Sequence, residues 1–174
     1  RRSLARQLFA GAARRHAAAL RVVGRAGVGV DNIDVEAATR RGVLVMNTPG
    51  SNAVSVAEHA LALLLALARS VPQLAAATRA GSWEKSGAQG TEIRGKTLGL
   101  IGLGRVGGEV ARRARALEMR VVASDPFLSE TAARDAGAEL LPLDDLLACA
   151  DFISLHTALS PAREKIVNAT ALAK

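Results

Sequence analysis

Three glycines in the segment 96–107 have the spacing of a phosphate-binding loop. Gly102, Gly104 and Gly107 form the pattern Gly-x-Gly-x-x-Gly directly after an apolar run. In this pattern the first glycine lets the chain turn off a strand, the second lets the backbone approach the phosphates, and the third allows close helix–strand packing. The following helix N-terminus offers unpaired N–H groups and a partial positive charge. The segment therefore predicts a binding site for the pyrophosphate of a dinucleotide.

An acidic residue downstream of the glycines indicates which dinucleotide is bound. Asp125 ends the next apolar run and lies 18 residues after Gly107, close to the expected spacing of about 20. A carboxylate there accepts hydrogen bonds from the ribose hydroxyls and repels the additional phosphate of NADP, so NAD is the predicted cofactor. The alternative is that Asp125 only caps a turn before Pro126.

The elements that must position these residues form a βαβ unit. Residues 98–101 and 121–123 are apolar enough for buried strands, and apolar residues recur at helical spacing from Val106 to Leu117. This alternation continues along the chain and predicts parallel sheets with right-handed crossovers, an α/β fold of the doubly wound Rossmann type. The other expected elements are strands at 20–23, 43–46, 140–142 and 152–155, and helices at 35–39, from 52 to 67, at 131–136 and at 143–148.

Two further segments carry groups suited to binding an anion. Arg25 follows the first expected strand, and the glycines at 27 and 29 would leave backbone N–H groups open; the alternative for Arg25 is an ordinary surface arginine. His156 and Thr157 end the last expected strand, at the sheet edge where open α/β folds bind their ligands. For His156 a position lining the cofactor is favoured over proton transfer.

The sequence shows no catalytic acid–base group with a convincing partner. The three histidines, at 16, 59 and 156, are far apart and lack metal-ligand spacing, so no metal is expected. His59 follows Glu58, but adjacent helical residues point in different directions. The sequence therefore predicts where a cofactor binds, but it does not predict which residues would catalyse a reaction with that cofactor.

Composition limits the classes of partner. The net charge is +7, yet three Phe, one Trp and no Tyr leave few rings for stacking on bases, so no nucleic-acid partner is expected. The Arg-rich opening before Asp31 is read as an exposed helix, with a transit peptide as the alternative. The apolar run 60–68 is too short to cross a membrane. Cys149 is the single cysteine, which excludes an internal disulfide and favours the cytoplasm.

Six segments together resemble the NAD-dependent D-2-hydroxyacid dehydrogenases. The resemblance runs from about Arg21 to the end, and it is closest to the members that oxidise 3-phospho-D-glycerate to 3-phosphohydroxypyruvate in L-serine biosynthesis. It implies a remnant of a flavodoxin-like substrate domain at 1–47, an incomplete Rossmann-type NAD-binding domain at 48–174, and a homo-oligomer acting on a small 2-hydroxy acid. The segments are 24–32, 36–43, 46–49, 57–60, 90–97 and 102–107.

The resemblance also implies roles for residues of the first loop. The backbone at Gly27, Val28 and Gly29 would face the substrate carboxylate and the nicotinamide of the cofactor. Arg25 and Asn52 would lie close to the substrate.

Further residues correspond to the family's cofactor contacts. Arg105 and Val106 would contact the pyrophosphate, Asp125 the ribose, and His156 with Thr157 the cofactor from the third strand. Ala158 stands where the family usually has proline, which implies a looser loop.

The family's catalytic arginine, glutamate and histidine correspond to positions downstream of Lys174, so no catalytic residue is expected here and these 174 residues alone are not expected to turn over substrate. The alternatives are a family member acting on glyoxylate, hydroxypyruvate or D-lactate, or a non-enzymatic NAD-sensing protein like the corepressors that share this fold.

Overall fold

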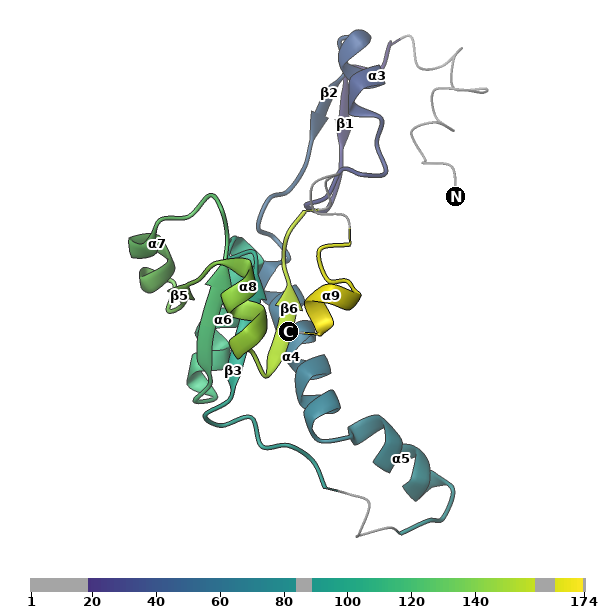
Figure 1. Ribbon diagram of the computed structural model, residues 1–174. Coiled ribbons are helices and arrows are strands. Elements are labelled where there is room, and N and C mark those ends of the chain that lie inside the picture. Colours follow the sequence, from purple (N-terminus) through teal and green to yellow (C-terminus); the bar gives the residue numbers. More distant parts are fainter. Residues whose placement is uncertain (1–18, 84–88, 159–164, 174) are drawn as a thin grey trace. The chain divides into compact units, whose positions relative to one another are not determined.

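The computed structural model describes residues 19–83, 89–158 and 165–173 (Figure 1). The chain divides into two compact units, Arg1–Asn52 and Ala53–Lys174. The division falls shortly after Pro49 and Gly50, a dipeptide typical of turns and loops. The boundary predicted at 47/48 stays a prediction, and the helix expected in the Arg-rich opening lies outside the described residues.

The first unit is a small parallel βαβ arrangement. Strands β1 (Val22–Gly24) and β2 (Leu44–Met46) pair in parallel, and α3 (Val35–Arg40) connects them. The carboxylate of Asp34 caps α3 by accepting a hydrogen bond from the backbone N–H of Ala37 at 2.9 Å. The strands and helix predicted here are confirmed within a residue or two at each end.

The second unit is built on a four-stranded parallel sheet in the order β5-β4-β3-β6 (Figure 1). Ile101, at the end of β3, lies opposite Ser124 of β4 and Leu155 of β6, so these three strands end at the same edge. This parallel arrangement confirms the predicted α/β class. The strands are β3 (Thr97–Ile101), β4 (Arg120–Ser124), β5 (Glu139–Leu140) and β6 (Phe152–Leu155).

Helices cover both faces of this sheet. Leu98 and Leu100 of β3 pack with residues of α4 (Ala53–Ala68) and α6 (Arg105–Ala116) in one apolar cluster. Ile101, which points to the opposite face, packs with residues of α8 (Leu143–Cys149) and near α9 (Ala169–Leu172) in a second cluster. The alternation of side chains along β3 thus supplies both cores, as expected for a strand buried on two faces.

Three features of the second unit differ from the sequence predictions. The apolar helix predicted from residue 52 is followed at once by α5 (Val71–Arg79), because Ser70 takes a positive φ of 50° that breaks the helix. The predicted strand at 140–142 is shorter, since Pro142 serves as the N-cap of α8. Helix α9 was not predicted. Helix α7 (Glu130–Asp135) matches its predicted range closely.

None of the described helices is by itself long and apolar enough to cross a membrane. The pair α4 and α5, which meet at 65°, passes that test of length and composition together.

Helix α6 lies against the end of β3 with almost no space between the two backbones. A Cβ added at Gly107 would come within 2.3 Å of the carbonyl oxygen of Gly102, well inside contact distance. A Cβ added at the next residue, Gly108, would meet nothing within 4 Å. The third glycine of the motif is therefore required by packing.

We expect Gly107→Ala to lower the free energy of unfolding by about 2–3 kcal/mol, because the methyl group forces the helix away from the strand. Gly108→Ala is the matched control in the same helix and should be neutral or stabilising by up to about 1 kcal/mol, from helix propensity alone. Urea denaturation of both variants measures the difference. Equal stability of the two variants would show that the contact between the backbones is not tight.

Candidate functional site

The candidate site lies at the carboxyl edge of the four-stranded sheet, where Gly102 turns the chain off β3. Gly102 has a φ of +95°, a conformation that favours glycine, and a Cβ there would come within 2.8 Å of the carbonyl oxygen of His156. The backbone N–H of His156 in turn donates to the carbonyl of Ile101 at 2.8 Å. The first glycine of the motif therefore lets the ends of β3 and β6 pack closely together.

The N-terminus of α6 is open at this edge. Gly104 is its N-cap residue in an extended conformation, with no side-chain cap, and the backbone N–H of Gly108 makes the first helical bond, to the carbonyl of Gly104 at 2.8 Å. Helix geometry leaves the three preceding N–H groups, of Arg105, Val106 and Gly107, without helical acceptors. A Cβ at Gly104 would meet nothing within 4 Å. An anion can therefore approach this backbone closely.

The two residues after Gly104 present different groups. The side chain of Val106 packs against the core cluster, so only its backbone N–H remains for a phosphate. Arg105 is exposed at the first position of α6, and its charge lies at the end of the helix where an anion would bind.

Asp125 lies beside this loop and is held in place by two backbone donors. Its Oδ2 accepts from the N–H of Leu103 at 3.0 Å, and its Oδ1 accepts from the N–H of Phe127 at 3.0 Å. The bond to Phe127 is the turn cap considered as the alternative role. Because each carboxylate oxygen has a second lone pair, Asp125 can still accept hydrogen bonds from two hydroxyl groups.

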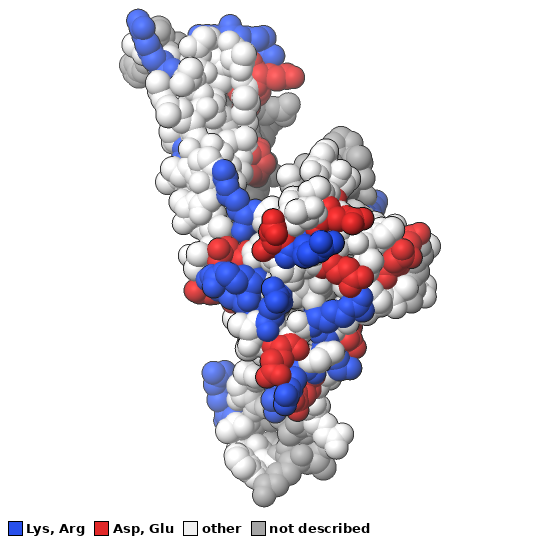
Figure 2. Space-filling view, turned by 90° about the vertical axis from the view of Figure 1, so that its left-hand side faces the viewer, with Lys and Arg blue, Asp and Glu red and all other residues white. Residues whose placement is uncertain are grey.

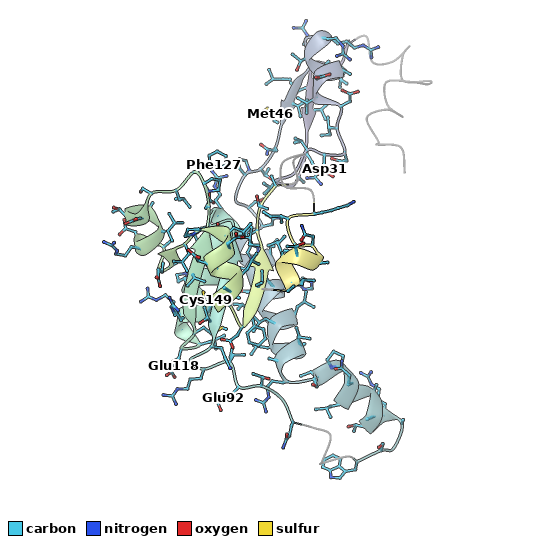
Figure 3. All side chains as sticks on the ribbon, viewed as in Figure 1. Asp31, Met46, Glu92, Glu118, Phe127 and Cys149 are labelled. Carbon is cyan, nitrogen blue, oxygen red and sulfur yellow. The ribbon has the colours of Figure 1, made fainter. Side chains whose placement is uncertain are left out.

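A cavity of about 940 Å³ opens next to Asp125, with mostly apolar walls. Gly102, Asp125 and Thr157 line it from three neighbouring strand ends, and the segment after β5 supplies its apolar side. Phe127 lies at its rim, with 83% of its surface exposed (Figure 3). The other lining residues are Ile101, Ser124, Pro126, Glu130, Leu140, Leu141, Pro142, Leu143 and Ile166.

The His156 side chain turns away from this cavity. Its Nε2 lies 2.9 Å from the hydroxyl of Ser154, and the ring lines another cavity, between β6 and α4. Burial lowers the pKa of His156 below its ordinary value, so the ring is neutral at pH 7. Thr157 is thus brought to the Asp125 cavity, whereas a contact of His156 with a cofactor stays a prediction.

The predicted substrate residues lie in the first unit. The guanidinium of Arg25 folds onto its own loop and donates from Nη1 to the carbonyl of Gly29. The N–H of Gly27 donates to Thr48 Oγ1 at 2.9 Å, which ties the loop to the segment after β2. The structure therefore brings Arg25, Gly27 and Gly29 together. Asn52 is exposed, and no described contact joins its side chain to that loop.

Three further points concern a metal site, Glu58 beside His59, and Val28. Among the described residues, no group of three His, Cys, Asp or Glu could hold a metal ion. Glu58 pairs with Arg113 of α6 at 3.8 Å, which directs its carboxylate toward that helix. The role of Val28 toward the cofactor stays a prediction, since Val28 belongs to the first unit.

The comparisons with known proteins agree with this geometry. Residues 61–174 match the sequence model described as the D-isomer specific 2-hydroxyacid dehydrogenase, NAD binding domain. The chain belongs to this family. The match confirms the predicted Rossmann-type fold and NAD as its cofactor. The open backbone at Gly104 and the carboxylate of Asp125 beside an apolar cavity fit that cofactor.

Individual relatives are similar over most of the chain. D-3-phosphoglycerate dehydrogenase of Archaeoglobus fulgidus is 56% identical over 137 residues, covering 79% of this chain and 26% of the relative. A Thermus thermophilus crystal structure matches with a TM-score of 0.82 and 40% identity, covering 91% of this chain and 50% of that one. The structure of D-lactate dehydrogenase from Aquifex aeolicus, complexed with NAD and lactic acid, matches with a TM-score of 0.78 and 30% identity. This match covers 88% of this chain and 46% of that one. The chain therefore spans about a quarter of the length of its curated relative.

Sequence reasoning missed the apolar side of the cavity. Leu141, Leu143 and Ile166 resemble ordinary core residues in the sequence, and they lie far from the glycine motif along the chain. The placement of β5 beside β4 brings Leu141 and Leu143 next to Asp125, and Ile166 reaches the same cavity from the segment after β6. The available signal was the strand order of a doubly wound sheet, which places neighbouring strand ends together.

The buried imidazole of His156 predicts a pH dependence of stability. Because its pKa is lowered in the folded chain, the unfolded chain binds the proton more readily, so the free energy of unfolding should fall as the pH drops below about 6.5. A hydrogen bond from Arg113 lowers the pKa of Glu109, and one from the backbone N–H of Thr97 lowers the pKa of Asp151. These two carboxyl groups therefore titrate at lower pH than His156.

We expect His156→Gln to flatten the dependence of unfolding free energy on pH between 5 and 7, measured by urea denaturation at each pH. His59→Gln makes the same substitution at an exposed position of α4 and is the comparison variant. If His156→Gln leaves the slope of unfolding free energy against pH unchanged, another group causes the pH dependence.

Proposed function

We propose that this chain is the cofactor-binding part of an enzyme that oxidises 3-phospho-D-glycerate to 3-phosphohydroxypyruvate with NAD, in L-serine biosynthesis. The choice of this substrate rests on the 56% identity to an enzyme named D-3-phosphoglycerate dehydrogenase. The chemistry would be the transfer of a hydride from the hydroxyl-bearing carbon of the substrate to NAD and of the hydroxyl proton to a general base, which leaves the keto acid and NADH.

We propose that the pyrophosphate is held by the backbone of the glycine loop. The open N–H groups at the start of α6, together with the Arg105 side chain, would neutralise its charge, and Gly104 lets it approach. Asp125 would accept the adenosine ribose hydroxyls with the lone pairs that its two backbone donors leave. The apolar walls from the segment after β5 suit an adenine ring, and Thr157 would contribute a hydroxyl to the same cavity.

The substrate residues proposed in the first unit follow from the chemistry of an anionic 2-hydroxy acid. Arg25 has five N–H donors and gives one to the carbonyl of Gly29, so the others remain for a carboxylate. The N–H groups of Val28 and Gly29 would add neutral donors, and Asn52 an amide. The N–H of Gly27 already donates to Thr48 Oγ1, so Gly27 would hold the loop in place. These groups bind and orient the substrate. None of these groups is a base that could remove the hydroxyl proton at neutral pH, because a guanidinium stays protonated and amide groups are not basic.

The nearest alternative is another oxidoreductase of this family. The Aquifex aeolicus neighbour shows that a protein with the same fold binds NAD and lactic acid. Its identity of 30% is far below that of the phosphoglycerate relative, so 3-phospho-D-glycerate remains the preferred substrate. A non-enzymatic NAD-sensing protein of the corepressor type is a second alternative, since the cofactor site alone does not distinguish binding from catalysis.

We further propose a cytoplasmic location and a homo-oligomeric state, either a dimer or a tetramer. The single cysteine supports a reducing compartment, because no disulfide can form within the chain. The exposed apolar side chains of α4, including Leu63 and Leu67, support burial against a further protein surface. We propose no nucleic-acid or membrane partner.

The proposed reaction is tested by the formation of NADH, measured at 340 nm, with the gene product that contains this chain. We expect kcat/KM for 3-phospho-D-glycerate to exceed that for D-lactate or glycolate by at least 100-fold, which corresponds to about 2.7 kcal/mol of additional transition-state binding. The reverse order would assign another member of the family. NAD binding without turnover of any of the three would favour the sensing protein.

A further inference from the structure

The cavity beside Asp125 has a second carboxylate on its wall. Glu130, the first residue of α7, lines this cavity together with Asp125. The start of α7 is fixed by Ser129, whose hydroxyl accepts from the N–H of Ala132 at 3.2 Å. Ala133 is fully buried and anchors the helix in the core cluster. The position of Glu130 relative to the sheet is therefore set by the fold.

The charge of the cavity wall has one sign. Asp125 and Glu130 are its charged residues, and none of the residues described as lining it is Lys, Arg or His. No ion pair to Glu130 is found among the described contacts. A separate hollow, which Glu130 also borders, is lined by Arg115, Arg120 and Arg134, and Arg120 there pairs with Glu139 at 2.7 Å.

The surrounding surface does not supply a strong field of either sign. Figure 2 shows, on the side where α7 and β5 lie in Figure 1, basic and acidic side chains interleaved over the middle of the face. At physiological salt, charges more than about 8 Å apart on such a surface are largely screened. The two carboxylates on the cavity wall are therefore the charges placed to discriminate between charged ligands there.

We propose that Glu130 is a second specificity-determining residue, which excludes NADP without contributing to the binding of NAD. The inference rests on the proposed placement of the adenosine ribose at Asp125. NADP carries a phosphate of about −1.5 to −2 charges on one of the hydroxyl groups that Asp125 would bind. Asp125 both accepts hydrogen bonds and repels that phosphate, whereas Glu130 only repels it.

This division predicts different effects for the two carboxylates. Glu130→Gln keeps the size of the side chain and removes its charge, so it should tighten NADPH binding about three- to tenfold and change NADH binding less than twofold. Asp125→Asn should weaken NADH binding about tenfold, because the hydrogen bonds to a charged acceptor are lost. The gain for NADPH in Glu130→Gln should shrink at 0.5 M salt.

The experiment is a titration of the gene product that contains this chain with NADH and NADPH, followed by calorimetry or cofactor fluorescence. Glu92→Gln is the matched control, because Glu92 is exposed, lies outside the cavity and gives the same change in net charge (Figure 3). Thermal melting verifies that each variant is folded. The control should leave both affinities unchanged.

The outcomes separate this inference from the proposed function. If NADH binds and Asp125→Asn weakens it, but Glu130→Gln leaves NADPH unchanged or matches Glu92→Gln, the role of Glu130 is overturned and the NAD site stands. If the unchanged protein does not bind NADH, or Asp125→Asn has no effect on it, the proposed ribose site fails and the inference fails with it.

Discussion

The contact between Gly107 of α6 and the carbonyl of Gly102 at the end of β3 is the constraint on which the site depends. Because no side chain separates these two backbones, the helix begins directly at the sheet edge and its unpaired N–H groups face the space outside the strand ends. The parallel register then brings the ends of β4 and β6 to the same edge, and with them Asp125 and Thr157. Close packing therefore creates the binding surface.

Asp125 links this packing to the selectivity proposed for the site. Its two backbone hydrogen bonds, from Leu103 in the glycine loop and from Phe127 after β4, fix the carboxylate without neutralising its charge. A fixed carboxylate accepts hydroxyl groups at little entropic cost and repels an additional phosphate. Asp125 thus caps a turn and holds the loop. These contacts leave its charge free for the proposed role in selecting the cofactor, so the two roles considered for it in the sequence are compatible.

The sequence predicts the β3–α6–β4 part of the fold well because local signals agree there. The apolar run before Gly102, the glycine spacing and the acid at 125 all indicate one βαβ unit, and the family resemblance indicates the same. The separation of α5 from α4 was missed, because the break depends on the positive φ of Ser70 and interrupts an otherwise apolar pattern. The orientation of His156 was also missed, because its ring lies near the Ser154 hydroxyl in a cavity that α4 helps to form, and the packing of α4 against β6 is a tertiary contact.

The most direct test of this account is the NADH affinity of Gly104→Ala. The added Cβ meets nothing in the folded chain, so stability should change by no more than about 1 kcal/mol, the scale of an N-cap substitution, while the methyl group obstructs the approach of the pyrophosphate. We expect at least a tenfold higher Kd for NADH in Gly104→Ala and an unchanged Kd in Gly108→Ala, measured by titration. Equal affinities in the two variants would contradict the claim that the pyrophosphate binds at the start of α6.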